Sequence, residues 1–247
     1  MMSALILVAA LVAQAPERTI LAIGAHAGDM ELTSGAVLAL HAQQGDRVVI
    51  LHLTLGEGGH PRRDPAAYAV QKRREAEAAA RVLGAEVRFA PYEDGQIPDT
   101  EPSRRYVAEV IRQVRPTHII THWKQSIHKD HATAHRIVVD AVLLAALEGV
   151  ELQEPAYRGV RGIYFAENWE DAEGFEPYLY IDVSDAEPTW RQAIREYEFT
   201  GAAFSGFAYR QYYEALHALR GAQIGRSHAV AFDLDPLGKR RVLERLP

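Results

Sequence analysis

The chain of 247 residues contains no cysteine, which excludes disulfide bonds and thiolate metal sites. It also lacks blocks of like charge, since the 27 basic and 33 acidic residues behind its net charge of −6 are interspersed. A nucleic-acid-binding face needs clustered basic residues, so this distribution argues against nucleic acid as a partner. Any transition-metal site must use imidazole and carboxylate ligands, for which the eleven histidines are candidates.

The sequence has no hydrophobic run long enough to span a membrane, and a shorter one lies near the N-terminus. Residues 4–13 are apolar, but this run is too short to span a bilayer as a helix. It resembles the hydrophobic region of a secretory signal, and Ala13-Gln14-Ala15 has the form of a cleavage site, although no Lys or Arg precedes the run. We therefore treat residues 1–15 as a candidate signal peptide, which predicts a periplasmic or extracytoplasmic location. If the segment is instead an extra element of the fold, a cytoplasmic location is expected.

Short apolar segments alternate with longer amphipathic ones from residue 16 onwards. The apolar segments are rich in Val, Ile and Leu, as buried strands are. They lie at Thr19–Gly24, Arg47–Leu55, Glu86–Ala90, Thr117–Thr121 and Tyr178–Val183. The predicted helices are Glu31–Gln44, Ala67–Leu83, Ser103–Val114, Ala132–Leu147 and one that starts with Pro188–Tyr197. Strands separated by such helices predict βαβ crossovers, so we expect one Rossmann-like α/β domain over residues 16–247, with a mainly parallel sheet flanked by helices.

Polar residues follow three of the predicted strands, at the edge of an open α/β sheet where ligands bind. These segments are His26–Glu31, Gly56–His60 and His122–His131. The first contains an H-x-x-D pair, His26 and Asp29, and the last contains an H-x-x-H pair, His128 and His131. Members of both pairs would supply two imidazoles and a carboxylate, a ligand set that suits zinc and leaves open positions for water and substrate. Another divalent ion could take the place of zinc.

The two pairs belong to a longer series of segments, GAHAGDME, LHLTLGEGG, REAEAAARVLG and HKDHATAHRIVVDA. Their order and spacing, from Thr19 to Ala141, resemble those of the PIG-L/LmbE-like zinc-dependent N-acetylglucosaminyl deacetylases, which carry A-H-P-D-D-x-E, L-T-x-G-E and H-P-D-H elements. The resemblance implies an LmbE-like fold and a metal-dependent hydrolase that removes an N-acyl group, usually acetyl, from an amino sugar or related small conjugate. The implied partner is that small molecule. The sequence leaves the oligomeric state open, a homo-oligomer included.

The resemblance also implies roles for individual residues. The zinc ligands that it implies are His26, Asp29 and His131. His128 corresponds to a histidine that stabilises the oxyanion of the tetrahedral intermediate, and Asp130 to an acid that orients His128 or His131. Glu57 matches the acid of the G-E element. The arginine that the family carries at the start of its second helix falls within Lys72-Arg73-Arg74, and which of the three corresponds to it stays open.

One position departs from the family pattern in a way that affects the chemistry. Gly28 replaces the aspartate that serves the family as general base, and a glycine cannot accept a proton. A general base contributes about 10²–10⁴-fold to the rate, so another carboxylate must act or the reaction is slow. The candidates are Glu31, Glu57 and Asp130. The alternative is a catalytically weak protein that keeps the metal and binds a ligand.

Several of these residues also have structural interpretations. Asp29 could cap the helix that follows it. His118 alternates with apolar residues and is expected in the core, while His122 is a candidate for the pocket wall. His135 lies one helical turn after His131 and could form a metal-binding pair with it. His228, from the C-terminal part of the chain, is a weaker candidate for the pocket.

Overall fold

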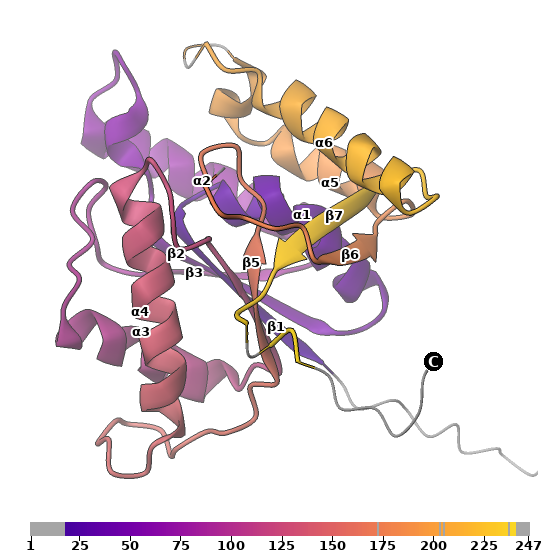
Figure 1. Cartoon of the computed structure of the whole chain (residues 1–247). Helices are drawn as coiled ribbons and strands as arrows, with labels where there is room; N and C mark the ends of the chain where they lie inside the picture. Colours follow the sequence, from indigo (N-terminus) through magenta and orange to yellow (C-terminus); the bar gives the residue numbers. More distant parts are fainter. Residues whose placement is uncertain (1–17, 172, 203, 205, 237, 241–247) are drawn as a thin grey trace, which may run out of the picture.

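The structure, a computed structural model, describes residues 18–171, 173–202, 204, 206–236 and 238–240 (Figure 1). Its strands are β1 (Thr19–His26), β2 (Arg47–Thr54), β3 (Glu86–Phe89), β4 (His118–Thr121), β5 (Gly162–Ala166), β6 (Leu179–Asp182) and β7 (Ala229–Asp233). Its α-helices are α1 (Asp29–Gln43), α2 (Pro65–Leu83), α3 (Glu101–Val114), α4 (Lys129–Ala146), α5 (Glu187–Ile194) and α6 (Tyr209–Gln223), and short 3₁₀ helices occupy Glu57–Gly59 and Glu198–Gly201. The candidate signal peptide, residues 1–15, lies outside the described residues.

The strands form one sheet in the order β3-β2-β1-β4-β5-β7-β6. The five strands from β3 to β5 in this order pair in parallel, whereas β7 pairs antiparallel with both β5 and β6. The predicted mainly parallel α/β sheet is therefore confirmed. The strand order reverses between β1 and β4, and such a switch point is where open α/β sheets bind their ligands.

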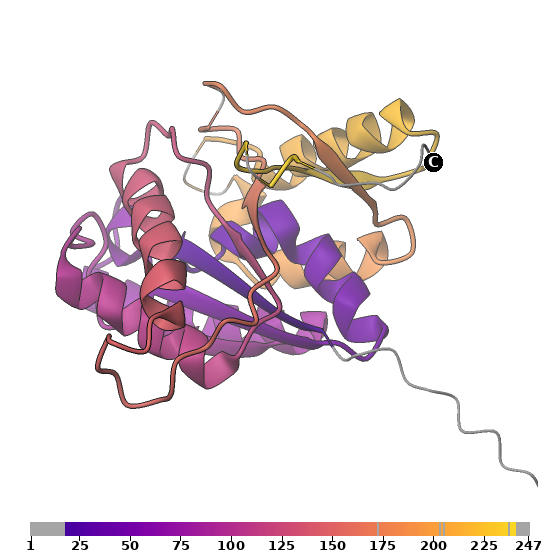
Figure 2. The same ribbon diagram turned by 60° about the horizontal axis from the view of Figure 1, so that its bottom comes forward.

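Helices cover both faces of the sheet (Figures 1 and 2). Helices α1 and α2 pack on one face, where α6 also contacts β7, and α3 and α4 pack on the other. Helix α1 is buried from Met30 to Ala39, because α5 and α6 cover the side that faces away from the sheet. This position explains why α1 is apolar on all sides and not along one stripe. No helix among the described residues has the length and apolar character needed to cross a membrane.

Most predicted elements are present with shifted ends, and three were not predicted. Strand β1 continues to His26, and α4 begins at Lys129 instead of Ala132. Helix α1 begins at Asp29 with Gly28 as its N-cap, so the interpretation of Asp29 as the cap is wrong. The elements missing from the prediction are β5, β7 and α6, which follow less regular stretches of sequence.

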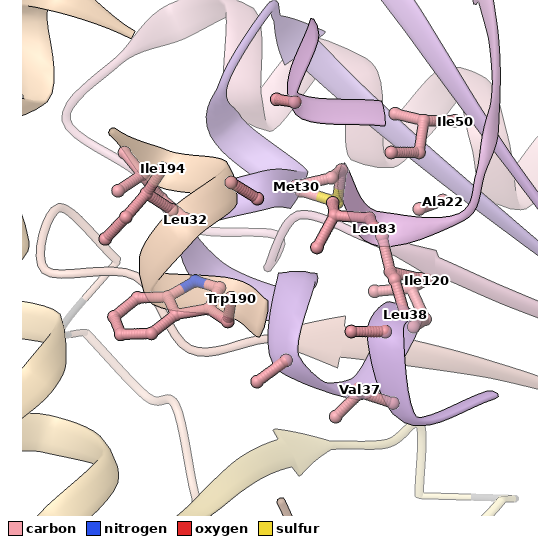
Figure 3. Packing of buried hydrophobic residues seen from close by; sticks show 14 of the residues in the cluster. Ala22, Met30, Leu32, Val37, Leu38, Ile50, Leu83, Ile120, Trp190 and Ile194 are labelled. Atoms are coloured by element: carbon pink, nitrogen blue, oxygen red, sulfur yellow. The ribbon is translucent and has the colours of Figure 1, made fainter. Parts of the chain in front are cut away.

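Trp190 of α5 packs against α1, as Figure 3 shows. It is fully buried, and a methyl group added at Gly35 of α1 would lie 2.8 Å from its Cδ1. We expect Gly35→Ala to lower the free energy of unfolding by up to about 2 kcal/mol, because overpacking costs about 1–3 kcal/mol and the better helix propensity of Ala returns about 1. Urea unfolding measures this. Gly149→Ala, where the new methyl meets no atom within 4 Å, is the control, and equal effects would contradict the expected clash.

Candidate active site

The candidate site lies at the switch point of the sheet, where β1 ends. His26 is the last residue of β1, Asp29 opens α1 and His131 lies in the first turn of α4. The chain turns from β1 into α1 at Gly28, whose φ of 106° is a conformation that residues with a side chain rarely adopt. The turn brings the Asp29 carboxylate back to the end of β1, where Oδ2 accepts a hydrogen bond of 2.7 Å from the backbone N–H of His26.

Two imidazoles converge on one carboxylate oxygen in this site. Asp29 Oδ2 lies 3.2 Å from His26 Nδ1 and 3.4 Å from His131 Nε2. Ligands at zinc distances in a tetrahedral site lie about 3.3 Å apart, so these separations match what a bound ion requires. The donor set of imidazole and carboxylate likewise fits a transition metal. Among the described residues, His131 belongs to two groups of potential metal ligands. It shares one with His26 and His128 and the other with Asp29 and His122.

His122 also approaches Asp29, but the lone pair on its Nε2 already accepts a hydrogen bond. Its Nε2 lies 3.2 Å from Asp29 Oδ2 and accepts a hydrogen bond of 2.9 Å from the backbone N–H of Ala25. Burial, together with the neighbouring His131, lowers the pKa of His122 to about 3. His122 is fully buried and does not line the pocket, so its interpretation as a pocket wall is wrong. It packs behind His131, with the two rings stacked at 4.0 Å.

The second nitrogen of His26 faces two further acids. His26 Nε2 lies 3.1 Å from Asp94 Oδ1 and 3.4 Å from Asp130 Oδ2. Burial by itself lowers the pKa of His26, but Asp29 and these two carboxylates outweigh it and raise the pKa well above its ordinary value. Asp130 therefore contacts His26, and it also accepts a hydrogen bond of 2.7 Å from the backbone N–H of Gly95. The expected contact of its carboxylate with His128 or His131 is not the one found.

A group of polar residues after β5 lies next to Nδ1 of His131, on the opposite side of the ring from Asp29. Its Nδ1 lies 3.3 Å from Glu170 Oε2 and 3.3 Å from the side-chain nitrogen of Asn168, with Asp171 at 4.0 Å. Glu170 Oε2 is buried and has no hydrogen-bond partner of suitable geometry among the described residues. Carboxylates thus accumulate around the imidazoles, which makes this part of the pocket favourable for a bound cation.

The sequence prediction missed Asp94, Asn168, Glu170 and Asp171. A usable signal was present, because the apolar run GIYFA is followed by the polar residues ENWED. This is the same pattern of a strand followed by polar residues that identified the other three segments.

His128 lines the pocket beside His26, with the two ring centroids 4.6 Å apart. Its Nδ1 accepts a hydrogen bond from the backbone N–H of Asp130 at 3.3 Å, which leaves the proton of a neutral ring on Nε2. Burial is the largest cause that lowers the pKa of His128, and the nearby His26 and His131 lower it further. A neutral ring with Nε2–H is a hydrogen-bond donor at the edge of the pocket.

The structure does not place Glu31 and Glu57 in the pocket. Glu31 is fully buried, and its Oε1 accepts a hydrogen bond of 2.7 Å from the hydroxyl of Tyr197. Glu57 Oε1 accepts a hydrogen bond of 2.8 Å from the backbone N–H of Asp94. Both acids therefore hold other parts of the site in position. The acids that line the pocket are Asp29, Asp94 and Glu170.

The pocket has a volume of about 190 Å³ and combines this polar floor with aromatic walls. The aromatic residues are Tyr68, Trp169, Phe199, Phe204, Tyr209 and Tyr213. Of the basic series Lys72-Arg73-Arg74, Lys72 lines the pocket, and its Nζ donates a hydrogen bond of 2.5 Å to the backbone carbonyl of Ala27. Of these three basic residues, Lys72 is thus the one whose side chain faces the pocket.

Lys72 should make stability depend on pH in the alkaline range. Burial lowers its pKa to about 8 in spite of nearby acids such as Glu75, whereas an unfolded chain has a lysine pKa of about 10.4. Between these values the unfolded chain holds the proton and the folded chain does not, so this contribution to stability rises with pH. We expect the parent to gain up to about 3 kcal/mol relative to Lys72→Met from pH 8 to 10.4. Urea unfolding across this range measures it. Lys124→Met, at an exposed lysine, is the control. If the difference in unfolding free energy between the parent and Lys72→Met did not change with pH, the lowered pKa of Lys72 would be contradicted.

The remaining histidine candidates lie outside the pocket. His135 Nδ1 hydrogen-bonds to the backbone carbonyl of His122 at 2.9 Å, which accounts for one of its ring nitrogens. His118 is half-buried and hydrogen-bonds to Thr117, at the opposite end of β4 from the site. The backbone N–H of His228 donates to the hydroxyl of Ser184 next to β6, and His228 does not line the pocket.

The chain has relatives among known proteins. Residues 21–142 match the family model described as PIG-L: GlcNAc-PI de-N-acetylase. The chain is similar to a 4-oxalmesaconate hydratase from Pseudomonas putida, with 28% identity over 178 residues that cover 68% of this chain and 69% of the relative. It is also similar to a 1D-myo-inositol 2-acetamido-2-deoxy-alpha-D-glucopyranoside deacetylase from Kineococcus radiotolerans, with 29% identity over 225 residues that cover 76% of this chain and 58% of the relative. The alignment thus spans little more than half of that deacetylase.

The fold has a counterpart among solved structures as well. A conserved protein from Thermus thermophilus superimposes with a TM-score of 0.79 and 26% identity, over 92% of this chain and 99% of that chain. The matched region of the family model, residues 21–142, contains the ends of β1, β2 and β4, where the histidines and Asp29 gather. Residues 21–142, which contain the ordered motifs and this His/Asp cluster, thus match the PIG-L family.

Proposed function

We propose that this chain is a zinc-dependent hydrolase that removes an N-acyl group, acetyl in the simplest case, from an amino sugar or related small conjugate. The observation that carries the proposal is the convergence of His26 Nδ1 and His131 Nε2 on Asp29 Oδ2 at the switch point of the sheet. These three residues would hold the ion. The deacetylase relative, whose name specifies a 2-acetamido sugar, supports the substrate class.

The ion would supply Lewis-acid polarisation of the acyl carbonyl. His128 adds a neutral Nε2–H donor at the edge of the pocket, suited to stabilise negative charge that develops on the carbonyl oxygen. Asp94 and Asp130 lie within ion-pair distance of His26 Nε2, and Glu170 Oε2 lies 3.3 Å from His131 Nδ1. Such contacts fix the orientation of ligand imidazoles.

The proton-accepting role needs a carboxylate that reaches the pocket. Position 28 offers none, and Glu31 and Glu57 are engaged elsewhere. Asp94 and Glu170 line the pocket on either side of the cluster. We assign the role to one of these two, because general-base catalysis requires hydrogen-bond reach to the reacting group.

The experiment that tests the proposal measures release of a primary amine from N-acetylglucosamine and from its inositol conjugate, with zinc supplied. We expect turnover by the parent and a rate lower by about 10²-fold or more for His128→Ala, because the loss of one oxyanion donor costs this much. His118→Ala is the control, since His118 lies outside the pocket. No amine release from these and other acetamido sugars by zinc-loaded protein would contradict the proposal.

A second candidate function is hydration of a conjugated carboxylate. The hydratase relative and the absence of an acid at position 28 favour it. Polarisation of a carbonyl by an ion at the same site would serve this reaction too. Loss of the conjugated absorbance of 4-oxalmesaconate, without amine release from acetamido sugars, would favour hydration. A protein that only binds its ligand is less favoured, because both relatives are named as enzymes.

A further inference from the structure

Phe199 occupies the space that a side chain at position 28 would need. A Cβ built on Gly28 would lie 2.8 Å from Phe199 Cζ and 2.9 Å from its Cε1. Both distances are shorter than van der Waals contact, and Tyr197 Cε1 follows at 3.6 Å. The absence of a side chain at Gly28 and the presence of the ring at Phe199 therefore depend on each other.

The neighbours of Phe199 are tied down on both sides. The hydroxyl of Tyr197 donates to buried Glu31, and the Glu198 carboxylate accepts a hydrogen bond of 2.6 Å from Gln71 of α2. Thr200 is buried, and its hydroxyl donates to the backbone carbonyl of Ile194 at 2.7 Å. The 3₁₀ helix that carries Phe199 is thus attached to α1, α2 and α5. The ring is a fixed part of the pocket wall.

The ring belongs to a continuous aromatic surface. Lys72 Nζ lies 4.1 Å from the centroid of Phe199, close enough for a cation–π contact. The Phe199 and Tyr209 centroids are 5.3 Å apart in an edge-to-face arrangement, and Tyr209 reaches Trp169 at 6.5 Å. We call Phe199, Tyr209 and Trp169 the aromatic wall. All three line the pocket.

The aromatic wall begins next to the reacting centre. Phe199 touches Gly28, which lies between His26 and Asp29 in the chain. A group bonded to the reacting carbon would therefore meet this wall, and Phe199 itself offers no hydrogen bond to a hydroxyl. Apolar, planar groups gain most from contact with aromatic rings.

We infer that Phe199 is a specificity-determining residue, which selects substrates with a planar apolar acyl group on the reacting carbon. The inference rests on the proposed hydrolysis of an N-acyl group and makes its substrate class more specific. An aroyl group is the simplest occupant, and acetyl would leave the aromatic wall uncovered.

The test compares benzoate with acetate, the carboxylates that correspond to the two acyl groups. Calorimetric titration of the parent is expected to show benzoate at least tenfold tighter than acetate. Phe199→Ala should reduce the ratio below threefold, and Phe199→Leu, which keeps apolar volume without the ring, should give an intermediate value. Phe89→Ala is the matched control, because Arg73 lies 4.0 Å over the Phe89 ring but Phe89 does not line the pocket. Its ratio should equal that of the parent.

Equal binding of both carboxylates by the parent, or an unchanged ratio in Phe199→Ala, would overturn the inference. The titrations are run with added zinc and again after chelator treatment, and neither needs turnover. Failure of the proposed hydrolysis would therefore appear in the amine-release assay, independently of this ratio.

A second measurement tests the contact itself without a ligand. Gly28→Ala is expected to lower the melting temperature of the parent by more than it does in a Phe199→Ala background, where the ring no longer fills the space. The backbone strain at Gly28 is common to both backgrounds, so it cancels in the comparison. Equal decreases in the two backgrounds would show that the ring does not occupy the place of the missing side chain.

Discussion

Replacing His131 by Ala is expected to lower the affinity for zinc by more than about 100-fold and to abolish turnover. Loss of a residue that only orients a metal ligand already costs about 10–100-fold, and His131 is proposed as a ligand itself. Its Nε2 approaches Asp29 Oδ2 at 3.4 Å, while Glu170 Oε2 lies 3.3 Å from its other nitrogen. Removal of the ring leaves His26 and Asp29 as the two remaining proposed ligands, which are too few to hold the ion tightly.

The affinity is measured by competition with a chromophoric chelator, and the zinc content by elemental analysis. His118→Ala is the matched control, a histidine of β4 that hydrogen-bonds to Thr117 and lies outside the pocket. It should bind zinc as the parent does. If His131→Ala kept the affinity of the parent, the assignment of His131 as a ligand would be wrong, and the cluster would need a different set of donors.

Trp190→Ala is expected to lower the free energy of unfolding by about 3–5 kcal/mol, which is typical of a large buried aromatic residue. Trp190 is fully buried, packs against Gly35 and donates a hydrogen bond of 2.9 Å to the backbone carbonyl of Glu31. Helix α5 spans only Glu187–Ile194 and depends on such contacts for its stability. Its displacement would also release the Tyr197–Phe199 segment beside the pocket.

Urea unfolding at constant pH measures this loss. Trp190→Phe keeps much of the apolar volume and removes the indole N–H, so it should cost less than Trp190→Ala. A loss below about 1 kcal/mol for Trp190→Ala would mean that the surrounding helices collapse into the space, since the cost depends on how well a site can relax.

The parts of the fold with regular patterns were predictable. Helix α2 was expected over Ala67–Leu83 and is found at Pro65–Leu83, and Gly84 ends it in the left-handed conformation expected of a C-cap. The strands β5 and β7 were missed, and the antiparallel pairing of β7 depends on contacts between segments far apart in the chain. Local periodicity does not contain that information.

The candidate site divides in the same way. The segments with His26, Asp29, His128 and His131 were found from their positions after strands, and the structure brings them into two groups of potential ligands that share His131. Glu31 has the residue type of a proton acceptor, but its helix turns it into the core, where Tyr197 holds it. Its burial follows from the packing of α5 and could not be read from its place in the motif.

The sequence by itself determined the parallel α/β architecture, the restriction of any transition-metal site to imidazole and carboxylate ligands, and the absence of an acid at Gly28. These depend on residue types and on periodicity along the chain. Only the tertiary structure decided which acids reach the pocket and what fills the space at Gly28. Asp94 and Glu170 come from loops after different strands, and Phe199 comes from a segment nearly 200 residues into the chain. Their meeting is a consequence of the strand order and of helix packing, which bring together residues with no local relation.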